Sequence, residues 1–339
     1  MKKIAIIAPP FTTIPPKGQG GTERIAYEMA EGLTKKGYDI TLFGAGKYKG
    51  KAKFFPVFEK TISQRNFDPT FTEASRPLRI EGAYMAKLMP ELSKYDVVFN
   101  HCRAGYLLLP LAKHFKIKVI TILHLPIFKE VADVLSNYKN IVTISNNQRK
   151  GFKLNYLKTV YNGINVKEFQ FSNKPKDYFL FMGAIGPHKN PKDAIKAAKK
   201  AGVKLVIASG KIRQEYFEKE IRSEIDGKQI KFIGEVSGKE RIKLFKEAKA
   251  FLFPIKWQEP FGLVMAEAMA CGTPVIAYPN GATREVVEDK KTGFIVKSPA
   301  EMAKAIKNID QINRKDCRER VEKLFTVEKM VNDYEKLIS

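Results

Sequence analysis

The sequence is poor in cysteine, in acidic residues and in long apolar runs. Its three cysteines, Cys102, Cys271 and Cys317, lie too far apart for a disulfide framework or a paired zinc site, which favours a reduced, cytoplasmic setting. The first apolar run stops at Pro9 and Pro10, whereas a signal peptide needs an apolar core of ~7–15 residues and a membrane span needs ~20. The sequence therefore predicts a soluble chain whose membrane contact, if any, is peripheral.

Acidic residues are outnumbered, with 36 Asp and Glu against 60 Lys and Arg, so the net charge is +24. The excess lies in both halves, and no five like charges follow one another, which argues against a free basic arm for nucleic acid. A basic folded surface remains open. Residues 47–60, in which Tyr48, Phe54, Phe55 and Phe58 lie among lysines, are the best candidate. They predict an edge that binds an anionic lipid or a polyanionic glycan.

The chain of 339 residues is long enough for two domains. Short apolar runs alternate with amphipathic segments, which predicts an α/β fold with two doubly wound parallel sheets. Residues 45–77 are expected to hold a strand and a loop. The expected strands are 3–8, 40–43, 97–100, 119–123, 141–144 and 159–161, then 178–182, 204–208, 230–233, 250–254 and 274–277. The expected helices are 22–36, 191–201, 215–225, 238–248 and 260–270, with two or three more after residue 300.

A polar stretch at residues 162–177 contains an Asn-Gly pair and a proline and is typical of an interdomain connection. Because doubly wound sheets bind ligands beyond the carboxyl ends of their strands, residues that follow strands are the candidates for function. With two such domains, the expected site is the cleft between them.

The first motif is Gly-Gln-Gly-Gly-Thr-Glu-Arg at residues 18–24. Gly20 and Gly21 would let the backbone approach a phosphate, and the following helix would offer free N–H groups. The motif is neither a P-loop nor a complete G-x-G-x-x-G, because Glu23 stands where the third glycine would be. A flexible connection between strand and helix remains the alternative.

The second motif is Trp-Gln-Glu-Pro-Phe-Gly-Leu at residues 257–263, continuing to Pro274. Pro260 predicts the start of a helix and Gly272 its end. The unpaired N–H groups of the first turn would then form an anion site. This site would use the backbone of Phe261, Gly262 and Leu263.

Two glutamates, Glu259 and Glu267, flank this predicted anion site. Eight helical residues span ~12 Å, more than the ~5–9.5 Å between glycosidase carboxylates, so we expect the two acids to hold separate parts of one elongated ligand. Glu267 interrupts an apolar run and therefore needs a partner. The alternative is that Glu259 only caps the helix and Glu267 lies on a solvated face.

Further candidates follow the expected strands. Lys189, in Gly-Ala-Ile-Gly-Pro-His-Lys-Asn at residues 183–190, would face a ligand, or else solvent. Of only four histidines, His101, His124 and His188 follow strand ends and are candidates for contact with a proton or a sugar hydroxyl. No Asp-x-Asp pair or H-E-x-x-H motif is present, so no carboxylate–metal site is expected.

Taken together, these motifs resemble the retaining glycosyltransferases of the GT-B fold, glycosyltransferase family 4. The resemblance rests on residues 20–24, 121–126, 144–149, 161–165, 259–267, 271–275, 281–285 and 292–294. It implies Rossmann-like domains at 1–165, on the acceptor side, and 166–325, on the donor side. It also implies a terminal helix within 326–339 that crosses back to the first domain.

The resemblance also implies roles for the candidate residues. Glu267 would hold the ribose of a nucleotide-diphosphate sugar and Glu259 the sugar hydroxyls, while Lys189 would neutralise the leaving diphosphate and His124 would contact the sugar. No metal or cofactor is implied. The remaining donor contacts would be Gly20 and Gly21 at the phosphates, residues 261–263 at the sugar or diphosphate, and Ser209, Gly210, Lys211, Gly234 and Val236 near the base.

One position departs from the family pattern, because Ala184 stands where these enzymes usually have a phosphate-binding arginine. Arg24 and Lys211 are the candidates to replace it.

The expected activity is the retaining, metal-independent transfer of a hexose from a UDP- or GDP-sugar to a lipid, glycan or other hydroxyl acceptor. The alternatives are a sugar phosphorylase, a nucleotide-sugar epimerase, and a non-catalytic protein that binds anions or nucleic acid.

Overall fold

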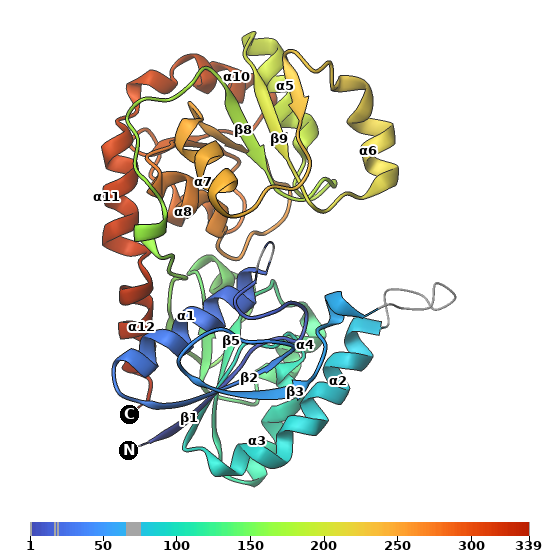
Figure 1. The fold of residues 1–339 in the computed structure, drawn as a ribbon, viewed down its shortest axis with the longest axis vertical. Coiled ribbons are helices and arrows are strands. Elements are labelled where there is room, and N and C mark those ends of the chain that lie inside the picture. The colour runs from blue at the N-terminus through green and yellow to red at the C-terminus, as the bar shows by residue number, and fades with distance from the viewer. Residues whose placement is uncertain (1, 17, 19, 66–75, 339) are drawn as a thin grey trace. The chain divides into compact units, whose positions relative to one another are not determined.

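The computed structural model describes residues 2–16, 18, 20–65 and 76–338. The chain forms two compact units, the first made of Met1–Gly163 with Val327–Ser339 and the second of Ile164–Thr326. Each unit contains one parallel sheet flanked by helices (Figure 1), which confirms the predicted α/β class. No helix in the described part of the chain is both long enough and apolar enough to span a bilayer.

The first unit contains a seven-stranded sheet in the order β3-β2-β1-β4-β5-β6-β7. The direction of the strand order reverses between β1 and β4, which is the topological switch point of this sheet. The strands are β1 Lys3–Ile7, β2 Asp39–Ala45, β3 Lys53–Phe58, β4 Val97–Asn100, β5 Lys118–Leu123, β6 Ile141–Thr143 and β7 Tyr156–Thr159. The helices are α1 Gly21–Lys35, α2 Arg76–Leu88, α3 Leu109–His114, α4 Lys129–Leu135 and α12 Val327–Glu335.

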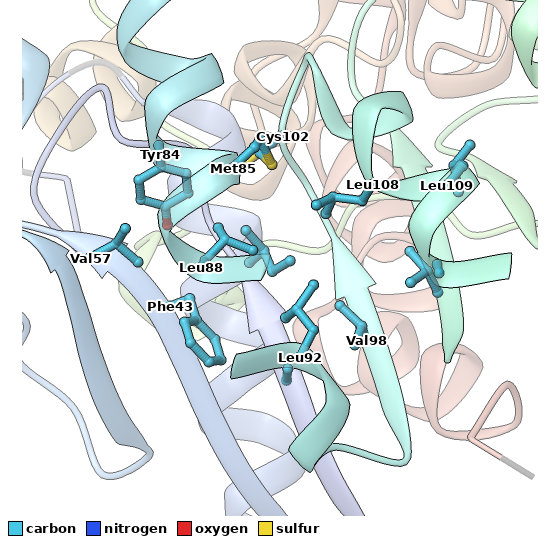
Figure 2. Close-up of a cluster of buried hydrophobic side chains, with 14 of the residues drawn as sticks. Phe43, Val57, Tyr84, Met85, Leu88, Leu92, Val98, Cys102, Leu108 and Leu109 are labelled. Atoms are coloured by element: carbon cyan, nitrogen blue, oxygen red, sulfur yellow. The ribbon is translucent and has the colours of Figure 1, made fainter. Parts of the chain in front are cut away.

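Apolar side chains of α2 pack against the sheet of this unit (Figure 2). Tyr84 and Leu88 are fully buried beside Phe43 of β2 and Val57 of β3. The Tyr84 hydroxyl donates to the carbonyl of Ala8, 2.8 Å away, so even the polar atom of this large side chain is satisfied.

Helix α12 packs against α1, although nearly three hundred residues separate them in the chain. Gly32 allows this close approach, because a Cβ atom at that position would lie 2.5 Å from Cγ2 of Val331. The last helix is therefore an integral part of the first unit.

The second unit contains a six-stranded sheet in the order β10-β9-β8-β11-β12-β13, with its switch point between β8 and β11. The strands are β8 Phe179–Met182, β9 Leu205–Ala208, β10 Ile230–Phe232, β11 Phe251–Phe253, β12 Val275–Ala277 and β13 Gly293–Ile295. The helices are α5 Pro191–Ala201, α6 Gln214–Glu220, α7 Gly238–Glu247, α8 Leu263–Ala270, α9 Thr283–Val286, α10 Pro299–Lys307 and α11 Arg314–Leu324.

Several predicted elements differ from the structure; the helix predicted at 215–225, for example, is α6, which ends at Glu220. The strand predicted at 159–161 is β7, which begins at Tyr156 and ends at Thr159. Strand β13, Gly293–Ile295, is not among the predicted strands. The helix predicted from Pro260 begins at Leu263, because Gly262 has a left-handed conformation (φ +83°) that a helix cannot include.

The predicted basic edge at residues 47–60 presents its lysines and turns its aromatic rings inward. Tyr48 stacks on Phe54 with ring centroids 5.0 Å apart, and its hydroxyl donates to the carboxylate of Glu31. Phe55 packs on Phe43, and Phe58 packs on Tyr84. The exposed side chains of this edge therefore include Lys47, Lys49, Lys51, Lys53 and Lys60. Strand β3 is the strand expected within residues 45–77, and residues 66–75 of that segment lie outside the described part.

Candidate functional site

Two predicted site residues flank the switch point of the second sheet. Lys189 follows β8 and Glu259 follows β11, and these two strands are neighbours. The Nζ atom of Lys189 lies 2.5 Å from Oε2 of Glu259 in a half-buried ion pair. The structure thus brings together the cation and the acid that the sequence placed seventy positions apart.

Trp257 completes this cluster, although the sequence analysis gave it no role. Its indole Nε1–H donates to Oε2 of Glu259 at 2.9 Å, and the Nζ atom of Lys189 lies 4.8 Å from the ring centroid. A cation over an aromatic face is attracted by the ring quadrupole. Trp257 therefore holds both partners of the ion pair.

His188 packs edge-on against Trp257, with ring centroids 5.9 Å apart. Partial burial, together with the positive charge of Lys189, lowers the pKa of His188. The imidazole is therefore mainly neutral near pH 7 and adds no second fixed cation beside Lys189.

The backbone of Glu259 is held by the segment that precedes α9. Its carbonyl accepts from the N–H of Ala282 at 2.8 Å, and the N–H of Gly281 donates to the side chain of Gln258 at 3.0 Å. A Cβ atom at Gly281 would overlap the backbone N and O atoms of Glu259. Only glycine at 281 permits this approach.

The helix N-terminus on which the predicted anion site at residues 261–263 depends lies further along the chain, because α8 begins at Leu263. Phe261 is buried and packs on Phe325, with ring centroids 5.4 Å apart, while Gly262 is the N-cap. The N–H groups that begin the helix are those of Leu263 and Val264, since the N–H of the next residue donates to the carbonyl of Gly262 at 2.9 Å.

Glu267 lies on α8 with only 2% of its surface exposed. Its carboxylate forms an ion pair with Arg241 of α7. The prediction that this acid needs a partner is confirmed, whereas the identity of the partner was not predicted. The alternative of a solvated Glu267 is wrong.

The residues expected near the base come together at the ends of β9 and β10. The N–H of Ser209 donates to the carbonyl of Gly234 at 2.8 Å, and its hydroxyl donates to the carbonyl of Lys211 at 2.9 Å. A Cβ atom at Gly210 would lie 2.5 Å from Cδ of Glu235, so this acid packs directly on the glycine. Val236 follows in the same segment, before α7.

In the first unit, Gly20 is the N-cap of α1 and Gly21 its first residue. Gly20 has φ +149°, and a Cβ atom there would lie 2.7 Å from Cβ of Pro16. The side chain of Arg24 donates to the carbonyl of Pro16 at 3.2 Å. Gln19 of this motif lies outside the described residues.

His124 follows β5 and pairs with His101, which follows β4. The Nδ1 atom of His101 lies 2.8 Å from Nε2 of His124. Burial lowers the pKa of both rings, that of His124 to about 3, with a further contribution from Arg103. In the described ranges, no cluster of three or more His, Cys, Asp or Glu side chains could hold a metal ion.

Two family models match the chain. "Glycosyltransferase Family 4" matches residues 19–168, and "Glycosyl transferases group 1" matches residues 164–324. An uncharacterised 41.2 kDa protein from the cps region of Klebsiella pneumoniae is 27% identical over 84% of this chain and 82% of its own length. The O-antigen chain mannosyltransferase RfbU of Salmonella typhimurium is 28% identical, over about half of each chain (51% and 52%).

Solved structures share the fold over the whole chain. Sucrose-phosphate synthase from Thermosynechococcus elongatus has a TM-score of 0.79 at 19% identity, covering 99% of this chain and 98% of its own. Anabaena HepE, solved with UDP-glucose, has a TM-score of 0.75 at 15% identity, covering 100% and 99%. The chain therefore belongs to the glycosyltransferases that the two family models describe, and it has the GT-B fold.

Proposed function

We propose that this glycosyltransferase transfers a hexose from a nucleotide-diphosphate sugar to a hydroxyl acceptor, with retention of configuration and without a metal ion. The observation that carries the proposal is the Lys189–Glu259–Trp257 cluster at the switch point of the second sheet. It sets a cation, a carboxylate and an aromatic face where a doubly wound sheet binds its ligand.

In this proposal, the diphosphate replaces Glu259 as the ionic partner of Lys189, and the released carboxylate of Glu259 binds sugar hydroxyls. Negative charge develops on the leaving diphosphate, so Lys189 and the first N–H groups of α8 stabilise the transition state. Glu267 holds the ribose hydroxyls. Both acids are paired with cations of the protein, Glu259 with Lys189 and Glu267 with Arg241. We therefore assign the neutralisation of the diphosphate charge to basic side chains and not to a metal ion.

The proposed transfer is direct and forms no covalent intermediate with a protein nucleophile. The bond from the anomeric carbon to the diphosphate oxygen breaks, and a bond to the acceptor oxygen forms on the same face of the sugar. The acceptor proton passes to the leaving phosphate oxygen. In the first unit, His124 is assigned to contact with the substrate.

We propose a UDP- or GDP-sugar as the donor. Support comes from HepE, which was solved with UDP-glucose, and from the mannosyltransferase RfbU.

The exposed lysines of residues 47–60 favour an anionic lipid or glycan acceptor and peripheral contact with an anionic membrane. The three free, buried cysteines fit a reduced, cytoplasmic setting.

The donor is tested by calorimetry with a panel of UDP- and GDP-sugars in the presence and absence of EDTA. We expect one donor to bind equally in both conditions, and Glu267→Gln to abolish that binding. Glu218→Gln is the matched control, because Glu218 forms an exposed ion pair on α6. Unchanged donor affinity in Glu267→Gln contradicts the ribose role, and loss of binding with EDTA contradicts metal independence.

The reaction is tested by NMR assignment of the product anomer. An α-linked product from an α-linked donor is expected, and an inverted anomer contradicts retention. Phosphate-dependent cleavage of a disaccharide would indicate a phosphorylase, and interconversion of donors without an acceptor would indicate an epimerase.

The acceptor is tested by co-sedimentation with lipid vesicles. We expect the protein to bind anionic but not neutral vesicles, and equal binding to both contradicts the lipid assignment.

A further inference from the structure

Two histidine rings stack at the ends of neighbouring strands in the first unit. Strands β4 and β5 pair in parallel, and His101 and His124 follow them directly. The ring centroids are 5.0 Å apart with an interplanar angle of 24°. The backbone N–H of His101 donates to the carbonyl of Ile7 at 3.0 Å, which fixes the base of its side chain to β1.

The pair shares one hydrogen bond, between Nδ1 of His101 and Nε2 of His124. Because burial lowers the pKa of both rings, both are neutral near pH 7. A neutral imidazole carries its proton on one nitrogen and accepts on the other. The tautomer of one ring therefore determines the tautomer of the other.

The surroundings of His101 decide which nitrogen carries the proton. His101 is 1% exposed, and its Nε2 atom is buried without a hydrogen-bond partner among the described residues. A proton on Nε2 would bury an N–H donor with no acceptor, and such orphaned donors are rarer than unfilled acceptors. The proton of His101 therefore belongs on Nδ1, and His124 accepts it at Nε2.

We propose that His101 is a positioning residue that fixes His124 as its Nδ1–H tautomer, so that His124 offers the substrate a hydrogen-bond donor and not a base. The substrate contact rests on the function proposed above, whereas the tautomer rests on the pair alone. In this state His124 cannot take the acceptor proton, which is the step assigned above to the leaving phosphate.

The tautomer is read directly from long-range ¹H–¹⁵N spectra of the full-length ¹⁵N-labelled protein. The chain has only four histidines, so single substitutions assign every ring. We expect a protonated Nδ1 on both His101 and His124 in the wild type at pH 7. A protonated Nε2 on His124 in the wild-type spectrum overturns the proposal.

Two substitutions separate positioning from packing. His101→Asn places an amide N–H near the position of Nδ1 and should keep the His124 tautomer, with less than about a twofold change in kcat/KM. His101→Phe keeps the ring but cannot donate, so the His124 signals should move to a mixture of tautomers and kcat/KM should fall by about tenfold, the loss of one hydrogen bond. His114→Phe, on the exposed side of α3, is the matched control.

An unchanged His124 tautomer in His101→Phe overturns the positioning role. If the tautomer shifts as expected but no protein variant, including the wild type, turns over any nucleotide sugar, the proposed function fails while the assignment of the pair stands.

Discussion

At the scale of single residues, Glu267 is almost fully buried, and the structure gives its charge an ionic partner in Arg241. A buried carboxylate is costly unless it is paired, so removing the partner costs more than the pair itself contributes. The guanidinium of Arg241 is also close to Phe245, at 5.6 Å from the ring centroid.

We predict that Arg241→Leu lowers the free energy of unfolding by about 3 kcal/mol, because it leaves Glu267 charged and unpaired. This is the lower end of the cost of breaking a buried ion pair, since the Arg241 side chain is 26% exposed. Adding Glu267→Gln should recover part of this loss. Urea denaturation measures both variants. Arg222→Leu is the control, since its ion pair with Glu218 is exposed and should contribute less than about 0.5 kcal/mol. Equal losses for Arg241→Leu and Arg222→Leu would show that the pair with Glu267 is not special.

Trp257 offers a second test, because it is the single tryptophan of the chain. Trp257→Phe keeps an aromatic face for Lys189 but removes the N–H donor to Glu259, so kcat/KM should fall by about tenfold. Trp257→Leu removes both contacts and should lose more. In the wild type, donor binding should change the fluorescence emission. If a donor that binds in calorimetry leaves the fluorescence emission unchanged, the donor binds away from the Trp257 ring.

At the scale of elements, the sequence predicts the bounds of a helix best where the residues that start it and the residues that stop it agree. The predicted bounds of α5 are confirmed, because Pro191 begins it and Gly202 follows it in a left-handed conformation (φ +73°). At α8 two signals compete, and the left-handed Gly262 overrides Pro260.

The candidate site was predictable in part. The acids and Lys189 carry recognisable motifs, whereas Arg241 lies on another helix and becomes the partner of Glu267 only when α7 packs on α8. A contact of this kind depends on tertiary packing and leaves no local pattern.

Two glycines with similar backbones allow a matched test of the loop that holds Glu259. Gly281 has φ +62° and Gly202 has φ +73°, so alanine is strained at both. An added Cβ meets nothing within 4 Å at Gly202, but overlaps the backbone of Glu259 at Gly281. We predict that both alanine variants lose stability by about 1 kcal/mol or more, and that only Gly281→Ala loses donor affinity in calorimetry. Full affinity in folded Gly281→Ala would refute the role of this loop.

The two histidines that follow β4 and β5 should make the stability of the first unit sensitive to acid. His101 and His124 have pKa values below the ordinary ~6.5 in the folded protein, so below that pH the unfolded chain binds more protons than the folded one. Stability should therefore fall as the pH falls from 7, and His124, whose pKa is lowered to about 3, should account for about 2 kcal/mol of the loss at pH 5. Denaturation at both pH values should show a smaller loss for His101→Asn than for the wild type. An equal loss in the two proteins would contradict the shift at His101.

At the scale of the whole molecule, the chain leaves the first unit after Gly163 and returns to it at Val327. The returning segment inserts apolar side chains into that unit, and the N–H of Gly163 lies 3.1 Å from Sδ of Met330. The Nζ atom of Lys2 donates to the carbonyl of Ile338 at 2.7 Å. The buried side chains of this segment include Met330, Val331, Tyr334, Leu337 and Ile338.

We predict that truncation after Thr326 unfolds the first unit and spares the second. At ~1.5–3 kcal/mol for each large apolar side chain, the loss is on the order of 10 kcal/mol, which matches the whole stability of a typical domain. The second unit, Ile164–Thr326, is continuous and keeps all its strands. Trp257 lies in that unit, so its fluorescence should still show a cooperative urea transition, while limited proteolysis should cut within residues 1–163.

A milder variant distinguishes lost packing from a general effect of shortening the chain. Gly32→Ala places a Cβ atom 2.5 Å from Val331 and must push α12 away from α1, so protease sensitivity should rise in the first unit alone. Gly82→Ala is the matched control, because Gly82 also lies within a helix, α2, but an added Cβ meets nothing within 4 Å. That substitution should stabilise the first unit by about 0.5–1 kcal/mol, since alanine loses less backbone entropy on folding. If the two alanine variants behave alike, the contact between α1 and α12 does not hold the last helix in place, and the effect of truncation needs another cause.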